Sequence, residues 1–169
     1  NSFSQACTTF VGQNYGAGQL KRCRKTLFLC LIEDAVATAA AIGIVLLSGR
    51  FLLSIFNNDP AVIDLGYVRL VTIFFAYIFS MLYEVMSGYL RGFGISLTPA
   101  ILTTLGVCGV RIVWIAAVFP KSRTFETIMT AYPVSLSLTA VLIFIALLIA
   151  HPSRRYASKF VTQKATDNN

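Results

Sequence analysis

The chain has 169 residues, of which 56% are hydrophobic and only 12% charged, and its formal net charge is +7. An average soluble domain has about 25% charged residues, so this composition excludes an ordinary soluble domain and favours a membrane protein. A net positive charge can also indicate nucleic-acid binding. The sequence has no stripe of basic residues interleaved with aromatic ones, however, and we expect no nucleic-acid partner.

Residues 1–18 are predicted to be the end of a transmembrane helix. The chain begins with Asn1 and no signal-peptide pattern precedes its first long apolar segment, so we expect the C-terminal piece of a longer protein. Gly12 and Gly16 stand four residues apart, which favours close helix packing, and the glycine spacing fits neither a Rossmann fingerprint nor a P-loop. The basic run at residues 21–25 then marks the exit from the membrane.

Four later stretches, all within residues 19–150, are long and apolar enough to cross a bilayer, which takes about 20 residues. They cover approximately residues 26–48, 63–88, 99–119 and 128–150. The second follows a predicted helix cap with Asp59 as N-cap and Pro60 at the first helical position, and the third repeats this device with Thr98 and Pro99. Pro133 predicts a kink or a late start in the fourth. The predicted fold class is an all-α, polytopic membrane protein, a helical bundle.

The basic residues outside these spans predict the topology. On one side of the membrane lie the run at 21–25, the loop around Arg91 and a basic tail at 151–169, whereas the other side holds only Arg50, Lys121 and Arg123. Because cytoplasmic loops carry the excess of Lys and Arg, we expect the opening loop, the Arg91 loop and the C-terminal tail to be cytoplasmic. The positive charge is therefore interpreted as a topology signal.

Four motifs carry a family resemblance. They are a GQNYGAG stretch, a Phe-x-x-Asp-Pro pattern, the stretch SGYLRGFGISLTP and the stretch VRIVW around Arg111. In this order and spacing they resemble the multidrug and toxic compound extrusion (MATE) family of efflux transporters, with one departure at Ile95, where the family usually has a polar residue. The matching motif residues, interpreted as structural, are Gly12, Gln13, Asn14, Gly16, Gly18, Asp59, Pro60, Gly88, Arg91, Gly92, Gly94 and Pro99.

The resemblance implies a twelve-helix transporter made of two six-helix lobes. Residues 1–18 would end helix 8, the four later helices would complete the C-terminal lobe, and the missing N-terminal lobe of the same chain would be their partner. Members of the family export cationic or amphipathic xenobiotics across the plasma membrane, the cytoplasmic membrane in bacteria, in exchange for Na⁺ or H⁺. This implies a multi-pass antiporter that uses a coupling ion and no cofactor.

Ionisable side chains inside a span are candidates for function, because inserting one costs about 2.5–3.5 kcal/mol. Glu84 leads, since its helical neighbours Tyr77 and Ser80 are polar and give the helix a face fit to line a cavity. Arg111 lies deeper in the next span, and a direct or water-bridged pair with Glu84 is predicted, either within a transport cavity or as a static pair that holds two helices together.

Two further acidic residues lie early in the first span. Glu33 and Asp34 are candidates for ion coupling, or they lie simply at the water boundary. Arg69 is interpreted as structural, because it is near the outer end of its span and can reach water or Asp64.

The sequence leaves two alternatives to the transport of drugs. A lipid-linked oligosaccharide flippase of the same superfamily would favour a cavity rich in Arg and Lys for phosphate, and a four-helix membrane scaffold would transport nothing. The four cysteines and His151 show no metal-ligand spacing, and no nucleophile–base constellation is visible. We therefore expect neither a metal site nor an enzyme.

Overall fold

The computed structural model describes residues 1–56, 59–120, 125–150 and 152. The described chain is helical and contains no strand: α1 (Ser2–Gly16), α2 (Leu20–Ser54), α3 (Pro60–Gly92), α4 (Leu97–Thr103), the π-helix η1 (Thr104–Gly109), α5 (Val110–Ala117) and α6 (Phe125–Ala150). Four helical segments are long and apolar enough to cross a membrane: Leu20–Ser54, Pro60–Gly92, Leu97–Ala117 and Thr127–Ala150. The predicted fold class, an all-α membrane protein, is confirmed.

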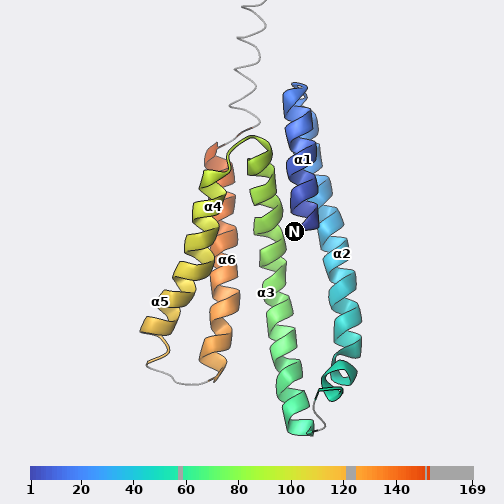
Figure 1. Cartoon of the computed structure of the whole chain (residues 1–169), viewed down its shortest axis with the longest axis vertical. Helices are drawn as coiled ribbons and strands as arrows, with labels where there is room; N and C mark the ends of the chain where they lie inside the picture. Colours follow the sequence, from blue (N-terminus) through green and yellow to red (C-terminus); the bar gives the residue numbers. More distant parts are fainter. Residues whose placement is uncertain (57–58, 121–124, 151, 153–169) are drawn as a thin grey trace, which may run out of the picture.

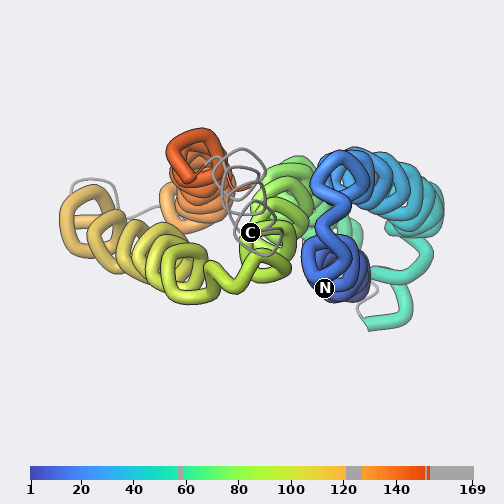
Figure 2. The backbone as a smooth tube through the Cα atoms, turned by 90° about the horizontal axis from the view of Figure 1, so that it is seen from above, coloured from blue at the N-terminus to red at the C-terminus, as the bar shows by residue number. Residues whose placement is uncertain are grey.

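Helix α3 is the centre of the bundle (Figures 1 and 2). It packs against α1 and α2 on one side and against α6 on the other, while α4, η1 and α5 pack mainly against α6. The chain thus forms two groups of helices that share α3. Many large apolar side chains on the outside of the bundle are exposed, as expected for helices that face lipid: Phe28, Leu47, Val113 and Ile149 are examples.

The helices run alternately in opposite directions, so their connections gather at two ends of the bundle (Figure 1). The α1–α2 turn, the α3–α4 turn and the end of α6 share one end, and the α2–α3 connection lies at the other. The loops predicted to be cytoplasmic are therefore brought together. Which side of the membrane they face remains a prediction of the positive-inside rule. Of the predicted tail at 151–169, only Pro152 is described.

Helices α1 and α3 approach each other closely. Ser4 Oγ donates a hydrogen bond to the Glu84 carbonyl oxygen at 2.6 Å, and Thr8 Oγ1 donates to the Gly88 carbonyl oxygen at 3.0 Å. A Cβ atom on Gly88 would lie 2.8 Å from Ser4 Oγ and nearer still to the Ser4 carbonyl oxygen, so only glycine fits. This is the close packing that small residues permit between membrane helices.

The prediction that Gly12 and Gly16 form the packing pair is only half right. A Cβ on Gly12 would be 3.6 Å from the Gly92 carbonyl oxygen, whereas one on Gly16 would meet nothing within 4 Å. The tight positions are instead Gly88 and Gly92 on the facing helix, and a Cβ on Gly92 would lie 2.6 Å from Val11 Cβ. The four-residue spacing was visible in the sequence, but which helix supplies the close approach depends on how the helices are rotated.

The helix ends test several expectations. Asp59 is the N-cap of α3, and its Oδ1 accepts a hydrogen bond from the Ala61 backbone N–H at 2.9 Å, as predicted. The predicted cap at Thr98 is wrong: α4 begins at Leu97, the preceding Ser96 makes no side-chain cap, and Pro99 is the third helical residue. Proline is still harmless there, because the first-turn N–H groups have no partner within the helix.

Helices α2, α3 and α6 all extend further than predicted. Helix α2 begins at Leu20, so the basic run at 21–25 lies in its first turns rather than in a loop. At about 1.5 Å per residue, this 35-residue helix is longer than ~30 Å of hydrocarbon, and its basic start lies beyond the apolar layer. Helix α6 runs through Pro133, so a late start there is wrong, and Ser137 Oγ donates to the Pro133 carbonyl oxygen at 2.6 Å.

Candidate functional site

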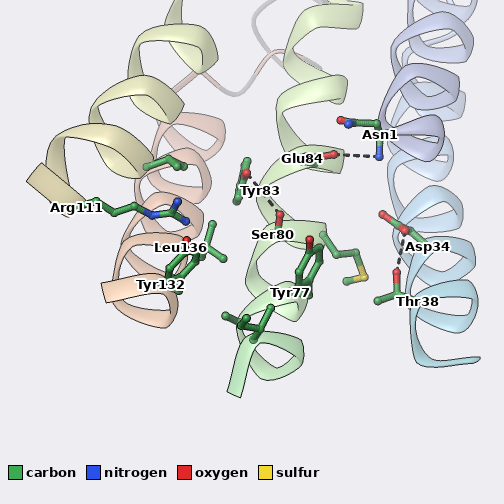
Figure 3. A pocket seen from close by; sticks show the side chains of 14 residues that line it. Asn1, Asp34, Thr38, Tyr77, Ser80, Tyr83, Glu84, Arg111, Tyr132 and Leu136 are labelled. Atoms are coloured by element: carbon green, nitrogen blue, oxygen red, sulfur yellow. Dashed lines mark hydrogen bonds and ion pairs between the residues drawn. The ribbon is translucent and has the colours of Figure 1, made fainter. Parts of the chain in front are cut away.

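A cavity of about 660 Å³, here called the main cavity, lies along α3 between α2 on one side and α5 and α6 on the other (Figure 3). Helix α3 supplies the polar side chains of Tyr77, Ser80, Tyr83 and Glu84. These residues share a face because 3.6 residues make one helical turn. The volume lies in the range of about 300–1,000 Å³ that is typical of sites for drug-sized ligands.

One wall of the main cavity is acidic. Asp34, from α2, lines it and accepts a hydrogen bond from Thr38 Oγ1 at 3.2 Å. The side chain of Glu84, from α3, is 29% exposed, and its Oε2 lies 3.1 Å from the amino nitrogen of Asn1. Two carboxylates from different helices therefore line the same cavity inside the membrane-spanning region.

The opposite wall carries Arg111 of α5. Its Nε donates a hydrogen bond to Ser135 Oγ at 3.1 Å, and its guanidinium carbon lies 4.2 Å from the centroid of the Tyr132 ring, a cation–π contact. Ser135 is fully buried and in turn donates to the Tyr132 carbonyl oxygen at 3.0 Å. Arg111 is thus held on α6 by a hydrogen bond and an aromatic face.

The predicted direct pair between Glu84 and Arg111 is not formed. Both line the main cavity, but from opposite walls, and neither makes an ion pair with the other (Figure 3). The physical reason is the packing of Arg111 against α6. The π-helical segment Thr104–Gly109 directly before α5 also changes the angular register of the residues that follow it, which a regular α-helical count from the sequence does not anticipate.

The remaining candidates divide cleanly. Tyr77, Ser80 and Asp34 line the main cavity together with Glu84 and Arg111, whereas the exposed Glu33 does not. Glu33 points about 100° away from Asp34 around the axis of α2, and its side chain lies on the exposed side of the helix. Asp64 was expected to be within reach of Arg69. Its Oδ1 lies 3.1 Å from Nη2 of Arg50, in an ion pair near the N-terminal end of α3.

Sequence reasoning missed Thr38, Tyr83, Tyr132 and Ser135. Thr38 had a signal, since it follows Asp34 by four residues and therefore lies on the same face of its helix. Tyr132 and Ser135 lie on α6, more than twenty positions from Arg111, and no local pattern joins them to it.

A second cavity of about 260 Å³ shares Tyr83 and Glu84 with the main cavity and extends toward the α3–α4 turn, where Ser87 and Thr103 line it. The buried Ser87 Oγ has no hydrogen-bond partner in the described part of the chain. Arg91, another lining residue, donates from Nη2 to Ser4 Oγ at 2.8 Å. Polar surface therefore continues from Glu84 toward the end of the bundle.

Other motif residues shape helix ends. Gly18 and Gly94 have positive φ angles of 71° and 81°, a conformation that favours glycine, and each follows the C-cap residue of its helix, α1 or α3. Asn14 Nδ2 donates to the Phe10 carbonyl oxygen at 2.8 Å, and Gln13 is exposed. These positions lie outside the main cavity.

Four helices long and apolar enough to span a membrane, lining a cavity of drug-like size with an acidic and a basic wall, form the kind of site that α-helical transporters place within the membrane. The family model described as MatE matches residues 1–116, and the chain belongs to the MATE family. The crystal structure of the eukaryotic MATE transporter AtDTX14 is similar to it, with a TM-score of 0.71 and 21% identity. That similarity covers 94% of this chain and 36% of the transporter, so the chain spans about a third of its length. No curated protein sequence matches the chain.

Proposed function

We propose that this chain is the C-terminal part of a secondary active transporter that exports drug-like amphipathic compounds across the plasma membrane in exchange for Na⁺ or H⁺. The observation that supports the proposal is the main cavity, in which Glu84 and Asp34 converge from two helices. Carboxylates are costly inside a membrane and are retained where they bind ions, protons or substrates. The N-terminal lobe would provide the facing wall.

The mechanism follows from competition at these carboxylates. A protonated or Na⁺-bound Glu84 has no net charge to offer a cationic compound, and a bound compound in turn displaces the ion. If the ion and the compound stabilise conformations that open to opposite sides of the membrane, release of one ligand favours the other conformation. Rocking of one lobe against the other then completes the transport cycle. Glu84 is the leading coupling residue because it touches both cavities.

The alternative of a flippase for lipid-linked oligosaccharides receives less support. A phosphate-binding cavity would need several basic side chains, whereas two carboxylates line this one and Arg111 is its one basic residue among those described. A non-transporting scaffold would have no need of a cavity of this size with ionisable walls.

Gradient-driven efflux from vesicles that hold the complete protein tests the proposal. In Glu84→Gln, efflux of a cationic dye is expected to fall to near background, because the amide keeps the size of the side chain but cannot take up a proton and has no negative charge to attract Na⁺ or the dye. Glu84→Asp should retain part of the activity. Glu33→Gln is the matched control, since Glu33 lies outside the main cavity and should leave efflux near the wild-type rate.

Imposing a Na⁺ gradient and a pH gradient separately identifies the coupling ion. Wild-type efflux by Glu84→Gln under both gradients, with normal amounts of protein in the membrane, would contradict the role of Glu84. Absence of efflux by the wild-type protein for every dye and gradient would contradict antiport itself.

A further inference from the structure

Most of the hydrogen-bonding capacity of Arg111 is unused within the described part of the chain. Arginine carries five N–H donors, and of these only the Nε–H has a hydrogen-bond partner among the described residues, Ser135 Oγ. The donors on the two Nη atoms have none in the same part of the chain. Because polar groups in a bilayer are otherwise satisfied by protein, water or ligand, the free edge of Arg111 needs an acceptor.

Two contacts restrict the orientation of that edge. The guanidinium carbon lies over the Tyr132 ring, 4.2 Å from its centroid, and Nε donates a hydrogen bond to Oγ of Ser135, which is fully buried. The plane therefore cannot turn freely, and the edge formed by the two Nη atoms is presented to the main cavity, which Arg111 lines (Figure 3). A guanidinium edge held in this way matches a carboxylate, which accepts two parallel hydrogen bonds from it.

The two walls of the main cavity have opposite charge. Glu84 and Asp34 lie on one side of α3 and Arg111 on the other, with the ring of Tyr77 on the helix between them (Figure 3). A ligand with a single positive charge would pair with the acidic wall and leave Arg111 without an acceptor. A ligand with an aromatic body, a cationic group and a carboxylate would satisfy both walls.

We propose that Arg111 is the anion subsite of the main cavity and that it selects zwitterionic aromatic ligands over the corresponding cations. This inference rests on the proposed function, since it names the chemical class of the exported compound. The subsite consists of Arg111, which binds the carboxylate, and of Ser135 and Tyr132, which position the guanidinium.

Rhodamine 110 and rhodamine 123 form a matched pair of probes, because they share the cationic xanthene and differ in one group: a free carboxylate in the first and its methyl ester in the second. Equilibrium binding to the purified complete protein is measured by fluorescence polarisation, without an ion gradient. A charge-assisted hydrogen bond pair predicts that the wild type binds rhodamine 110 about tenfold more tightly than rhodamine 123.

In Arg111→Gln, affinity for rhodamine 110 should fall about tenfold and affinity for rhodamine 123 should stay within about twofold, so the preference disappears. Arg111→Lys should keep part of the preference, because it retains the charge and loses the planar edge. Arg50→Gln is the control: Arg50 also lies over a tyrosine ring, Tyr67 at 5.6 Å, but pairs with Asp64 outside the main cavity, and its replacement should leave both affinities unchanged.

Equal affinities of the wild type for the two probes would overturn the subsite, and this result does not depend on whether any variant folds. An equal loss of affinity for both probes in a well-folded Arg111→Gln would also overturn the subsite, and it would indicate that Arg111 has a structural role. Because binding needs no gradient, the outcomes separate from those of the efflux assay. Gradient-coupled efflux without an Arg111-dependent preference for rhodamine 110 would refute the subsite alone. That preference without gradient-coupled efflux would refute antiport alone.

Discussion

Replacing Gly88 by alanine tests the closest contact in the bundle. The added Cβ would lie 2.8 Å from Ser4 Oγ, 3.1 Å from the Ser4 carbonyl carbon and nearer to its oxygen, whereas ordinary contacts are 3.4–4 Å. Two of these atoms belong to the backbone of α1, so no side-chain rotation relieves the clash. Helix α1 must retreat from α3, and Gly88→Ala is expected to destabilise the protein.

The magnitude follows from three contributions. Overpacking costs about 1–3 kcal/mol. The retreat of α1 stretches the Ser4–Glu84 and Thr8–Gly88 hydrogen bonds, now 2.6 and 3.0 Å, and interhelical hydrogen bonds in membranes contribute about 0.6 kcal/mol each. Alanine returns about 1 kcal/mol of helix propensity. The expected net loss in the free energy of unfolding is about 1–3 kcal/mol.

The assay is thermal unfolding of the purified complete protein in detergent, monitored by size-exclusion chromatography. Gly43→Ala is the matched control, because Gly43 is also inside a long helix and a Cβ there would meet nothing within 4 Å. The control should be as stable as the wild type or more stable, and Gly88→Ala should melt at a lower temperature. If both variants melt together, α1 and α3 do not approach as closely as described and the reasoning fails.

Two further predictions concern single polar side chains. Ser87→Ala should leave the melting temperature unchanged or raise it, because the buried Ser87 Oγ has no described partner to lose, and a clear drop in the same assay would reveal one. Asp59→Ala should lower the free energy of unfolding by about 1 kcal/mol, because it removes the cap on the Ala61 N–H. Asp64→Ala is the control, since the ion pair of Asp64 with Arg50 is well exposed and contributes little. Equal effects of the two substitutions would argue against the cap.

Much of the candidate site was predictable from the sequence. Tyr77, Ser80 and Glu84 were expected on one face of a helix, and they line the same cavity, because helical periodicity determines which residues of one helix lie together. Asp34 was distinguished from Glu33 only by the structure. Their positions along the helix are almost the same, and the rotation of α2 about its axis decides which of them faces α3.

Contacts between helices were the part that the sequence left open. Tyr132 and Ser135 became the partners of Arg111, and Gly88 rather than Gly16 became the point of closest approach. Such contacts depend on the depth, tilt and rotation of one helix relative to another. These quantities are set by packing against neighbouring helices and not by the composition of either helix alone.

The sequence by itself determined that the chain is a membrane protein with four spanning helices, because hydrophobic length is a local property that the ~30 Å thickness of the bilayer imposes on each segment separately. It also determined the cap at Asp59, which depends on residues only two positions apart. Only the tertiary structure decided that Glu84 and Arg111 lie on opposite walls of one cavity, because the π-helical turn before α5 and the stacking on Tyr132 direct the arginine away from the acid.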